Sequence, residues 1–269
     1  MKKYVSIFML SARETLYKAL GVMILMGAGQ IGIYWLSFQN AMREYEAEMQ
    51  NVLTNPDLAN WNVPYPSLET ILDQGPMSLP WIELLWAMAL VALIVLLGSS
   101  GNSRKGAEQS RYTVQRLNVK EWKQVICQAI YNFAVFIIFW AFSVGIALLI
   151  CKLFYSQADP ASYGSQSIYL MFYRNDLFHS LLPLAEVLRY VRNVCMFLAF
   201  AVLCAVDVFW KRRGKKIGAG IFANLYLALS FIRPMGDSSS NLLWIIVSIG
   251  CVGISVYYLV CHLEEDARE

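Results

Sequence analysis

The sequence predicts an all-α integral membrane protein with six transmembrane helices, and three observations predict this class. First, 58% of the 269 residues are hydrophobic and mean hydropathy is +0.47, but only 15% are charged, against about 25% in soluble domains. Second, several charge-free windows reach the roughly 20 residues that a helix needs to cross a bilayer. Third, basic residues gather in alternate connections between these windows, which the positive-inside rule requires.

Four charge-free windows mark spanning helices directly, and two shorter windows with charged ends add a fifth and a sixth helix. Long basic side chains at the ends of the shorter windows reach the headgroups, so a shorter apolar core suffices there. The charge-free windows are residues 19–42, 84–103, 124–151 and 238–263, and the shorter windows are residues 193–206 and 217–232. The predicted helices run over residues 17–37, 81–100, 124–153, 185–210, 217–233 and 242–262.

The positive-inside rule places both termini in the cytoplasm, because most of the 22 lysines and arginines then lie on the inner side. The whole chain, residues 1–269, forms one transmembrane domain. Its first outer loop covers about residues 38–80 and its second about residues 155–184. The only long inner connection is the polar segment at about residues 101–123.

An amphipathic helix on the inner leaflet precedes the first span. Apolar residues recur there at spacings of three and four, which is typical of one helix face. These residues are Val5, Phe8, Met9, Ala12 and Leu16. An uncleaved signal-like anchor is the alternative, since Lys2 and Lys3 precede the apolar patch.

Two further short helices are expected in the outer loops. Ser67 is a helix cap and Gly75 a stop for one of them, and residues 41–50 extend the first spanning helix beyond the membrane. Aromatic residues favour an interfacial helix around Ile168–Leu182.

The sequence offers no enzyme active site, metal centre or cofactor site. The six cysteines form no C-x-x-C pair and are interpreted as apolar packing residues. No phosphate-binding G-x-x-x-x-G-K-[ST] motif occurs. His179 and His262 fall on opposite sides of the membrane in the predicted topology, and His262 is interpreted as a cap near the end of the last helix.

The inner connection at residues 104–123 predicts a short helix over residues 107–117, roughly parallel to the membrane. Val114 and Leu117 share one face, and Arg111 and Arg116 point elsewhere. A mixed apolar and basic face of this kind suits docking to another protein. A solvated basic loop that only fixes topology is the alternative.

The order of these elements resembles the membrane subunit of ABC exporters of the type-2 permease class. In that family the helix between the second and third spans is a coupling helix that docks into the ATP-binding subunit. Glu108, Tyr112, Thr113 and residues 117–121 stand at the places of the family's local pattern. Asn118 replaces its usual proline and Lys120 its usual serine.

The resemblance implies a bacterial plasma-membrane permease that forms half of a translocation pathway. A cytosolic subunit would bind ATP and Mg²⁺, and a second permease subunit, the same or a related chain, would complete the pathway. The residues that would couple to the ATPase are Glu108, Arg111, Val114, Arg116 and Leu117. "KRRGKK", residues 211–216, is either a second ATPase contact or a clamp on anionic lipid. The resemblance names no substrate.

Polar residues inside spans are candidates for function, although interhelical hydrogen bonds are the alternative. The amides in question are Gln30, Gln128, Asn132 and Asn224. Asp207 is expected to pair with Arg212 or Lys211. Glu186 and Arg189 are expected to form an ion pair at the outer boundary, with a substrate gate as the alternative.

Two other function classes compete with the exporter. A membrane sensor, anchor or assembly protein would use the connector as a docking surface with no pump attached. A secondary transporter should have an internal repeat and a charged site at the membrane midplane, and the sequence has neither feature.

Overall fold

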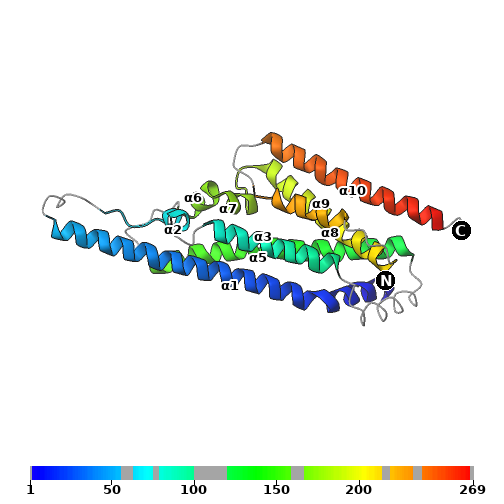
Figure 1. The fold of residues 1–269 in the computed structure, drawn as a ribbon, viewed down its shortest axis with the longest axis horizontal. Coiled ribbons are helices and arrows are strands. Elements are labelled where there is room, and N and C mark those ends of the chain that lie inside the picture. Colours follow the sequence, from blue (N-terminus) through cyan, green and yellow to red (C-terminus); the bar gives the residue numbers. More distant parts are fainter. Residues whose placement is uncertain are drawn as a thin grey trace. The chain divides into compact units, whose positions relative to one another are not determined.

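The computed structural model describes residues 2–55, 63–74, 79–99, 120–158, 167–213, 219–232 and 238–266. Within these ranges every regular element is a helix and no strand occurs, as Figure 1 shows. The helices are α1 Lys2–Thr54, α2 Leu68–Gln74, α3 Leu79–Gly98, α5 Glu121–Gln157, α6 Ser167–Arg174, α7 Asp176–Leu181, α8 Val187–Arg212, α9 Ala219–Leu229 and α10 Ser238–Asp266. The predicted all-α class is confirmed for the part of the chain described.

Five of these helices are long and apolar enough to cross a membrane, which indicates a multi-pass membrane protein. The spans lie within Val5–Thr54, Leu79–Gly98, Glu121–Gln157, Val187–Arg212 and Ser238–His262. The predicted fifth span, residues 217–233, corresponds to α9. With 11 residues, α9 is about 16 Å long, roughly half the thickness of a bilayer core.

Contacts divide the chain into two compact units, the first made of residues 1–23, 87–141 and 185–269. In this unit α8 packs along both α9 and α10 (Figure 1). Helix α8 is buried along most of its length, whereas α10 is mostly exposed. Aromatic rings fill the contact between α5 and α8, where the ring centroids of Phe136 and Phe200 are 5.6 Å apart. Helix α8 is therefore the centre of the first unit.

The second unit consists of residues 24–86 and 142–184. Trp86 Nε1 donates to Ser143 Oγ at 3.1 Å, which joins α3 to α5 inside this unit. Arg174 at the end of α6 forms an ion pair with Glu69 of α2 at 3.0 Å. The Arg174–Glu69 pair thus holds two of the predicted outer-loop helices, α2 and α6, together.

Helix α2 confirms the predicted cap. Ser67 Oγ accepts a hydrogen bond from Thr70 N at 3.1 Å, which satisfies one of the free N–H groups at the start of the helix. The interfacial helix expected at 168–182 is instead two helices, α6 and α7. Asn175 separates them because its side chain caps α7, with Phe178 N donating to Asn175 Oδ1 at 3.1 Å.

The predicted N-terminal interfacial helix is not a separate element, because α1 runs without a break from Lys2 to Thr54. No glycine or proline interrupts residues 2–20. Val5 and Met9 of the predicted apolar face are exposed, as residues turned toward lipid would be, while Ser11 and Thr15 are buried. In a membrane, apolar residues lose nothing by facing lipid, and polar residues gain by finding partners on neighbouring helices.

Two glycines of α1 allow close helix packing within the second unit. A Cβ on Gly27 would lie 2.9 Å from Ile146 Cδ1 of α5, and one on Gly29 would lie 2.9 Å from Leu85 Cδ1 of α3. Both distances are shorter than a normal contact, so larger residues at these positions would force the neighbours apart.

Candidate functional site

The five coupling candidates, Glu108, Arg111, Val114, Arg116 and Leu117, lie outside the described residues, as does the whole stretch 100–119. The two ends of this connector are described. Gly98 and Ser99, at the end of α3, precede it, and Lys120 and Glu121, at the start of α5, follow it. The site can therefore be built from the residues that hold these ends.

Both ends of the connector are held by the basic C-terminal end of α8. Lys211 Nζ donates to the carbonyl oxygen of Gly98 at 2.5 Å, and the guanidinium of Arg213 forms an ion pair with the Glu121 carboxylate. The Arg213 guanidinium also lies 4.7 Å from the centroid of the Phe209 ring. Through these two contacts, α8 ties the exit of α3 to the entry of α5.

Deeper in the same unit, a ladder of buried side chains connects α1, α5 and α8. Ser11 Oγ donates to Gln128 Oε1 at 2.6 Å. Gln128 Nε2 donates to Asn132 Oδ1 at 3.1 Å, and Asn132 Nδ2 donates to the carbonyl oxygen of Ala201 at 3.2 Å. The first turns of α5 therefore move with α1 and α8 unless these hydrogen bonds break.

The other two amides also bond between helices. Gln30 Nε2 donates to the carbonyl oxygen of Ile82 at 3.2 Å, between α1 and α3 of the second unit. Asn224 Nδ2 donates to Cys204 Sγ at 3.4 Å, between α9 and α8 of the first unit. All four predicted amides thus make the interhelical hydrogen bonds that are the alternative to a direct functional role.

Asp207 does not pair as expected. Lys211 lies one turn further along α8, but its ammonium group is directed to Gly98, and no described basic side chain comes within ion-pair distance of Asp207. The carboxylate instead lies against the backbone of Gly220 in α9, where a Cβ would be 2.5 Å from Asp207 Oδ1. The expected ion pair is wrong because backbone groups of α3 and α9 compete successfully for both side chains.

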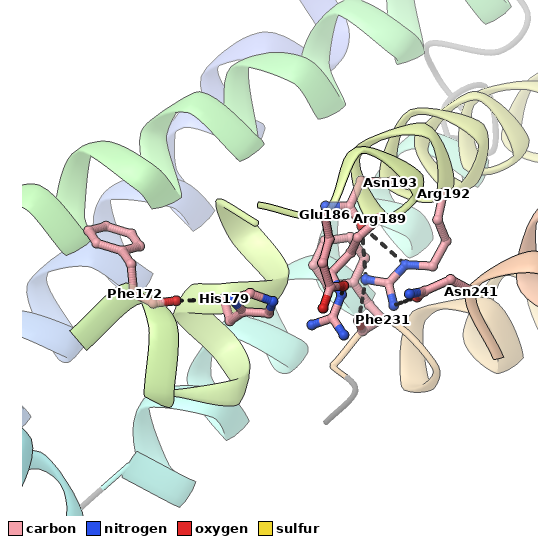
Figure 2. A network of polar contacts seen from close by, with 8 residues as sticks. All are labelled: Phe172, His179, Glu186, Arg189, Arg192, Asn193, Phe231 and Asn241. Atoms are coloured by element: carbon pink, nitrogen blue, oxygen red, sulfur yellow. Dashed lines mark hydrogen bonds and ion pairs between the residues drawn. The ribbon is translucent and has the colours of Figure 1, made fainter. Parts of the chain in front are cut away.

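The expected ion pair between Glu186 and Arg189 is confirmed, with Arg189 Nε 2.8 Å from Glu186 Oε2 (Figure 2). Glu186 is only partly buried, whereas the Arg189 side chain has no exposed surface. The fully buried Arg189 guanidinium is thus paired with the partly exposed Glu186 carboxylate at the start of α8.

A second network, centred on Arg192, was not expected from the sequence (Figure 2). Arg192 has no exposed surface, and its guanidinium donates to Asn241 Oδ1 at 2.9 Å, Asn193 Oδ1 at 2.9 Å and the carbonyl oxygen of Phe231 at 3.1 Å. It therefore joins α8 to the segment after α9 and to the first turn of α10. In the sequence, this network is indicated only by Arg192 and Asn193 near the start of α8 and Asn241 near the start of α10.

Each of the two histidines packs against a neighbouring helix. In the second unit, the Nδ1 atom of His179 lies 3.2 Å from the carbonyl oxygen of Phe172, which joins α7 to α6 (Figure 2). In the first unit, the His262 ring packs on Trp210 with the centroids 4.9 Å apart. Helix α10 continues to Asp266, so the interpretation of His262 as a cap is wrong. Among the described residues, no three His, Cys, Asp or Glu side chains cluster as metal ligands would.

Comparison with known proteins adds no relative. The chain matches no protein-family model, no curated protein and no solved structure.

Proposed function

We propose that the chain is the membrane subunit of an ATP-driven ABC exporter and forms half of its translocation pathway. The observation that carries the proposal is the attachment of both connector ends to α8, through Lys211 on Gly98 and Arg213 on Glu121. A force applied to the connector would enter α3, α5 and α8 together. This is the mechanical requirement for a coupling segment that drives a helix bundle.

In the proposed arrangement, six helices span the plasma membrane of a bacterium, α9 belongs to the fifth span, and both termini are cytoplasmic. A separate cytosolic subunit binds ATP and Mg²⁺, and its closure pushes on residues 107–117. The ladder from Ser11 through Gln128 and Asn132 to α8 supports this mechanism, because it passes motion of α5 to two further helices. A second permease subunit, the same or a related chain, completes the pathway.

The proposal predicts a nucleotide-dependent partner. The chain purified from its host in mild detergent should carry a cytosolic ATPase in stoichiometric amount, and Arg111→Ala with Leu117→Ala should lower ATP hydrolysis by the complex about tenfold. Removing one buried apolar contact and one charged contact from an interface costs at least 1.4 kcal/mol, the equivalent of a factor of ten. Arg104→Ala, a change of the same charge in the same segment, is the control and should leave hydrolysis unchanged.

A chain that purifies alone and responds to no nucleotide contradicts the exporter and favours a membrane sensor or anchor. Equal losses in the Arg111/Leu117 variant and in the Arg104 control would also contradict it, because the effect would then follow net charge rather than a docking face.

The tie at the end of α8 is tested by exchanging its charges. Arg213→Glu alone and Glu121→Arg alone should each slow transport-coupled ATP hydrolysis by up to about fivefold, the size expected for a partly exposed ion pair worth about 1 kcal/mol. The double exchange restores the opposite charges and should recover most of the loss. Losses that add in the double variant would show that Arg213 and Glu121 do not act as a pair in coupling.

A further inference from the structure

A cavity of about 550 Å³ lies among α8, α9 and α10 of the first unit. Its volume falls within the range of sites that hold small molecules. Apolar side chains form most of its wall: Leu203, Val206 and Trp210 from α8, Ala223 from α9 and Ile254 from α10. Ile254 and Tyr258, on the α10 side of the cavity, are exposed. In a bilayer that side faces lipid, so an occupant can enter from the hydrocarbon phase.

One carboxylate, that of Asp207, lines this cavity and is 2% exposed. The backbone N–H of Gly220 donates a hydrogen bond to it. Asp207 Oδ2 is buried and accepts no hydrogen bond from any described residue. A buried carboxylate oxygen without a partner is costly in apolar surroundings, and such groups inside membrane helices mark ligand sites.

Among the described residues, Lys211 is the positively charged side chain that interacts electrostatically with Asp207. Its ammonium group is bound to the Gly98 carbonyl oxygen at 2.5 Å rather than to the carboxylate. A place beside Asp207 Oδ2 is therefore open to a cation that comes from outside the chain.

We propose that this cavity binds an amphiphilic organic cation, with its single positive charge beside Asp207 and its apolar body against the α8, α9 and α10 side chains. Mg²⁺ and Ca²⁺ do not fit, because they require about six or more oxygen ligands and the described residues offer no group of three metal-ligating side chains. Binding is a property of this chain alone. Only the identification of the cation as cargo rests on the proposed export function.

Equilibrium dialysis of tetraphenylphosphonium against the full chain in phosphatidylcholine nanodiscs tests the proposal. Asp207→Asn keeps the size of the side chain and an acceptor for the Gly220 N–H, but removes the charge, and should weaken binding at least tenfold. Ala223→Phe keeps the charge, fills the cavity and should weaken binding as much. Glu83→Gln on α3 removes the same charge from another apolar helix outside the cavity and should leave binding unchanged.

Cys251, which also lines the cavity, gives a second measurement in the unaltered chain. Tetraphenylphosphonium should slow alkylation of Cys251 by N-ethylmaleimide at least fivefold, and should leave the partly buried Cys127 of α5 unaffected, as read from peptide masses. Equal binding by the wild type and the Asp207→Asn variant would mean partition into lipid and would overturn the proposal. A second result would also overturn the proposal. If Cys251 resists alkylation without the cation and forms a disulfide between two copies of the chain, a second chain fills the cavity.

Thermal unfolding distinguishes a ligand site from a structural carboxylate. The Asp207→Asn variant should unfold at the same temperature as the wild type or higher, because it relieves a buried charge. A marked fall in unfolding temperature would assign Asp207 to the packing of α8 on α9 and overturn the proposal. Cation binding by a chain that purifies without an ATPase would contradict the proposed export function but support the binding site. An ATPase complex that binds no cation would support the export function and contradict the binding site.

Discussion

Arg192→Leu is expected to lower the free energy of unfolding by about 3 kcal/mol, the loss typical when one partner of a buried ionic network is removed. The guanidinium donates to two asparagine side chains and to the Phe231 carbonyl oxygen, and leucine would leave all three acceptors without these donors inside the bundle. The guanidinium also lies 5.6 Å from the Phe231 ring centroid. Unfolding in mixed micelles, followed by tryptophan fluorescence, measures the change.

Two variants make the Arg192 result interpretable. Arg192→Lys keeps the charge but offers donors from a single nitrogen, so it cannot span acceptors on α8, α10 and the residue after α9, and should lose about 2 kcal/mol. Lys152→Leu removes a positive charge from an exposed position on α5 and should change stability by less than about 0.5 kcal/mol. Equal stability of the wild type and the Arg192→Leu variant would mean that the network does not hold α8 to α10.

Hydropathy predicted the long helices because a bilayer-spanning segment must be apolar over its whole length, which is visible in the sequence without knowledge of the packing. The expected span at 185–210 is Val187–Arg212 in the structure, and the expected span at 81–100 is Leu79–Gly98. The α9 region was harder, because an 11-residue helix between charged ends has the composition of a span without its length.

The contacts that make the candidate site were beyond sequence reasoning. Lys211 is 113 residues from Gly98 in the sequence, and its acceptor is a backbone carbonyl, which every residue carries and no pattern reveals. Asn132 reaches the carbonyl oxygen of Ala201 in the same way. The Glu186–Arg189 pair was predictable because both partners lie within one helical turn, where spacing alone determines proximity.

The N-terminal part of α1 packs through its polar side chains, for a physical reason that applies to any membrane helix. In water, a stripe of apolar side chains turns inward, but Val5, Phe8 and Met9, which the sequence assigns to the inner leaflet, are exposed. In lipid the gain comes from pairing polar groups, and α1 turns Ser11 and Thr15 toward α5, where Thr15 Oγ1 lies 2.7 Å from the Tyr131 hydroxyl. A search for hydroxyl and amide side chains at four-residue spacing would have found this face.

Glu186→Ala is expected to cost about 3 kcal/mol, because it removes the carboxylate from an arginine that has no exposed surface. Arg189→Met should cost less, about 1 kcal/mol, since the carboxylate it leaves is partly exposed and can be hydrated. If the two side chains stabilise α8 as a pair, the double variant should lose about 2 kcal/mol less than the sum of the single losses. The free energy of unfolding of all four proteins in mixed micelles gives this coupling directly.

The cycle measures the coupling between Glu186 and Arg189, because effects of either side chain that do not involve the other cancel. Glu186 precedes α8 without a side-chain capping hydrogen bond, and its backbone oxygen, which accepts from Arg189 N at 3.1 Å, survives the change to alanine. Any effect of the negative charge on the helix dipole appears equally with and without Arg189 and cancels. Single losses that add to within about 0.5 kcal/mol would show that Arg189 is held by its other contacts in the bundle, and that Glu186 stabilises the start of α8 by charge alone.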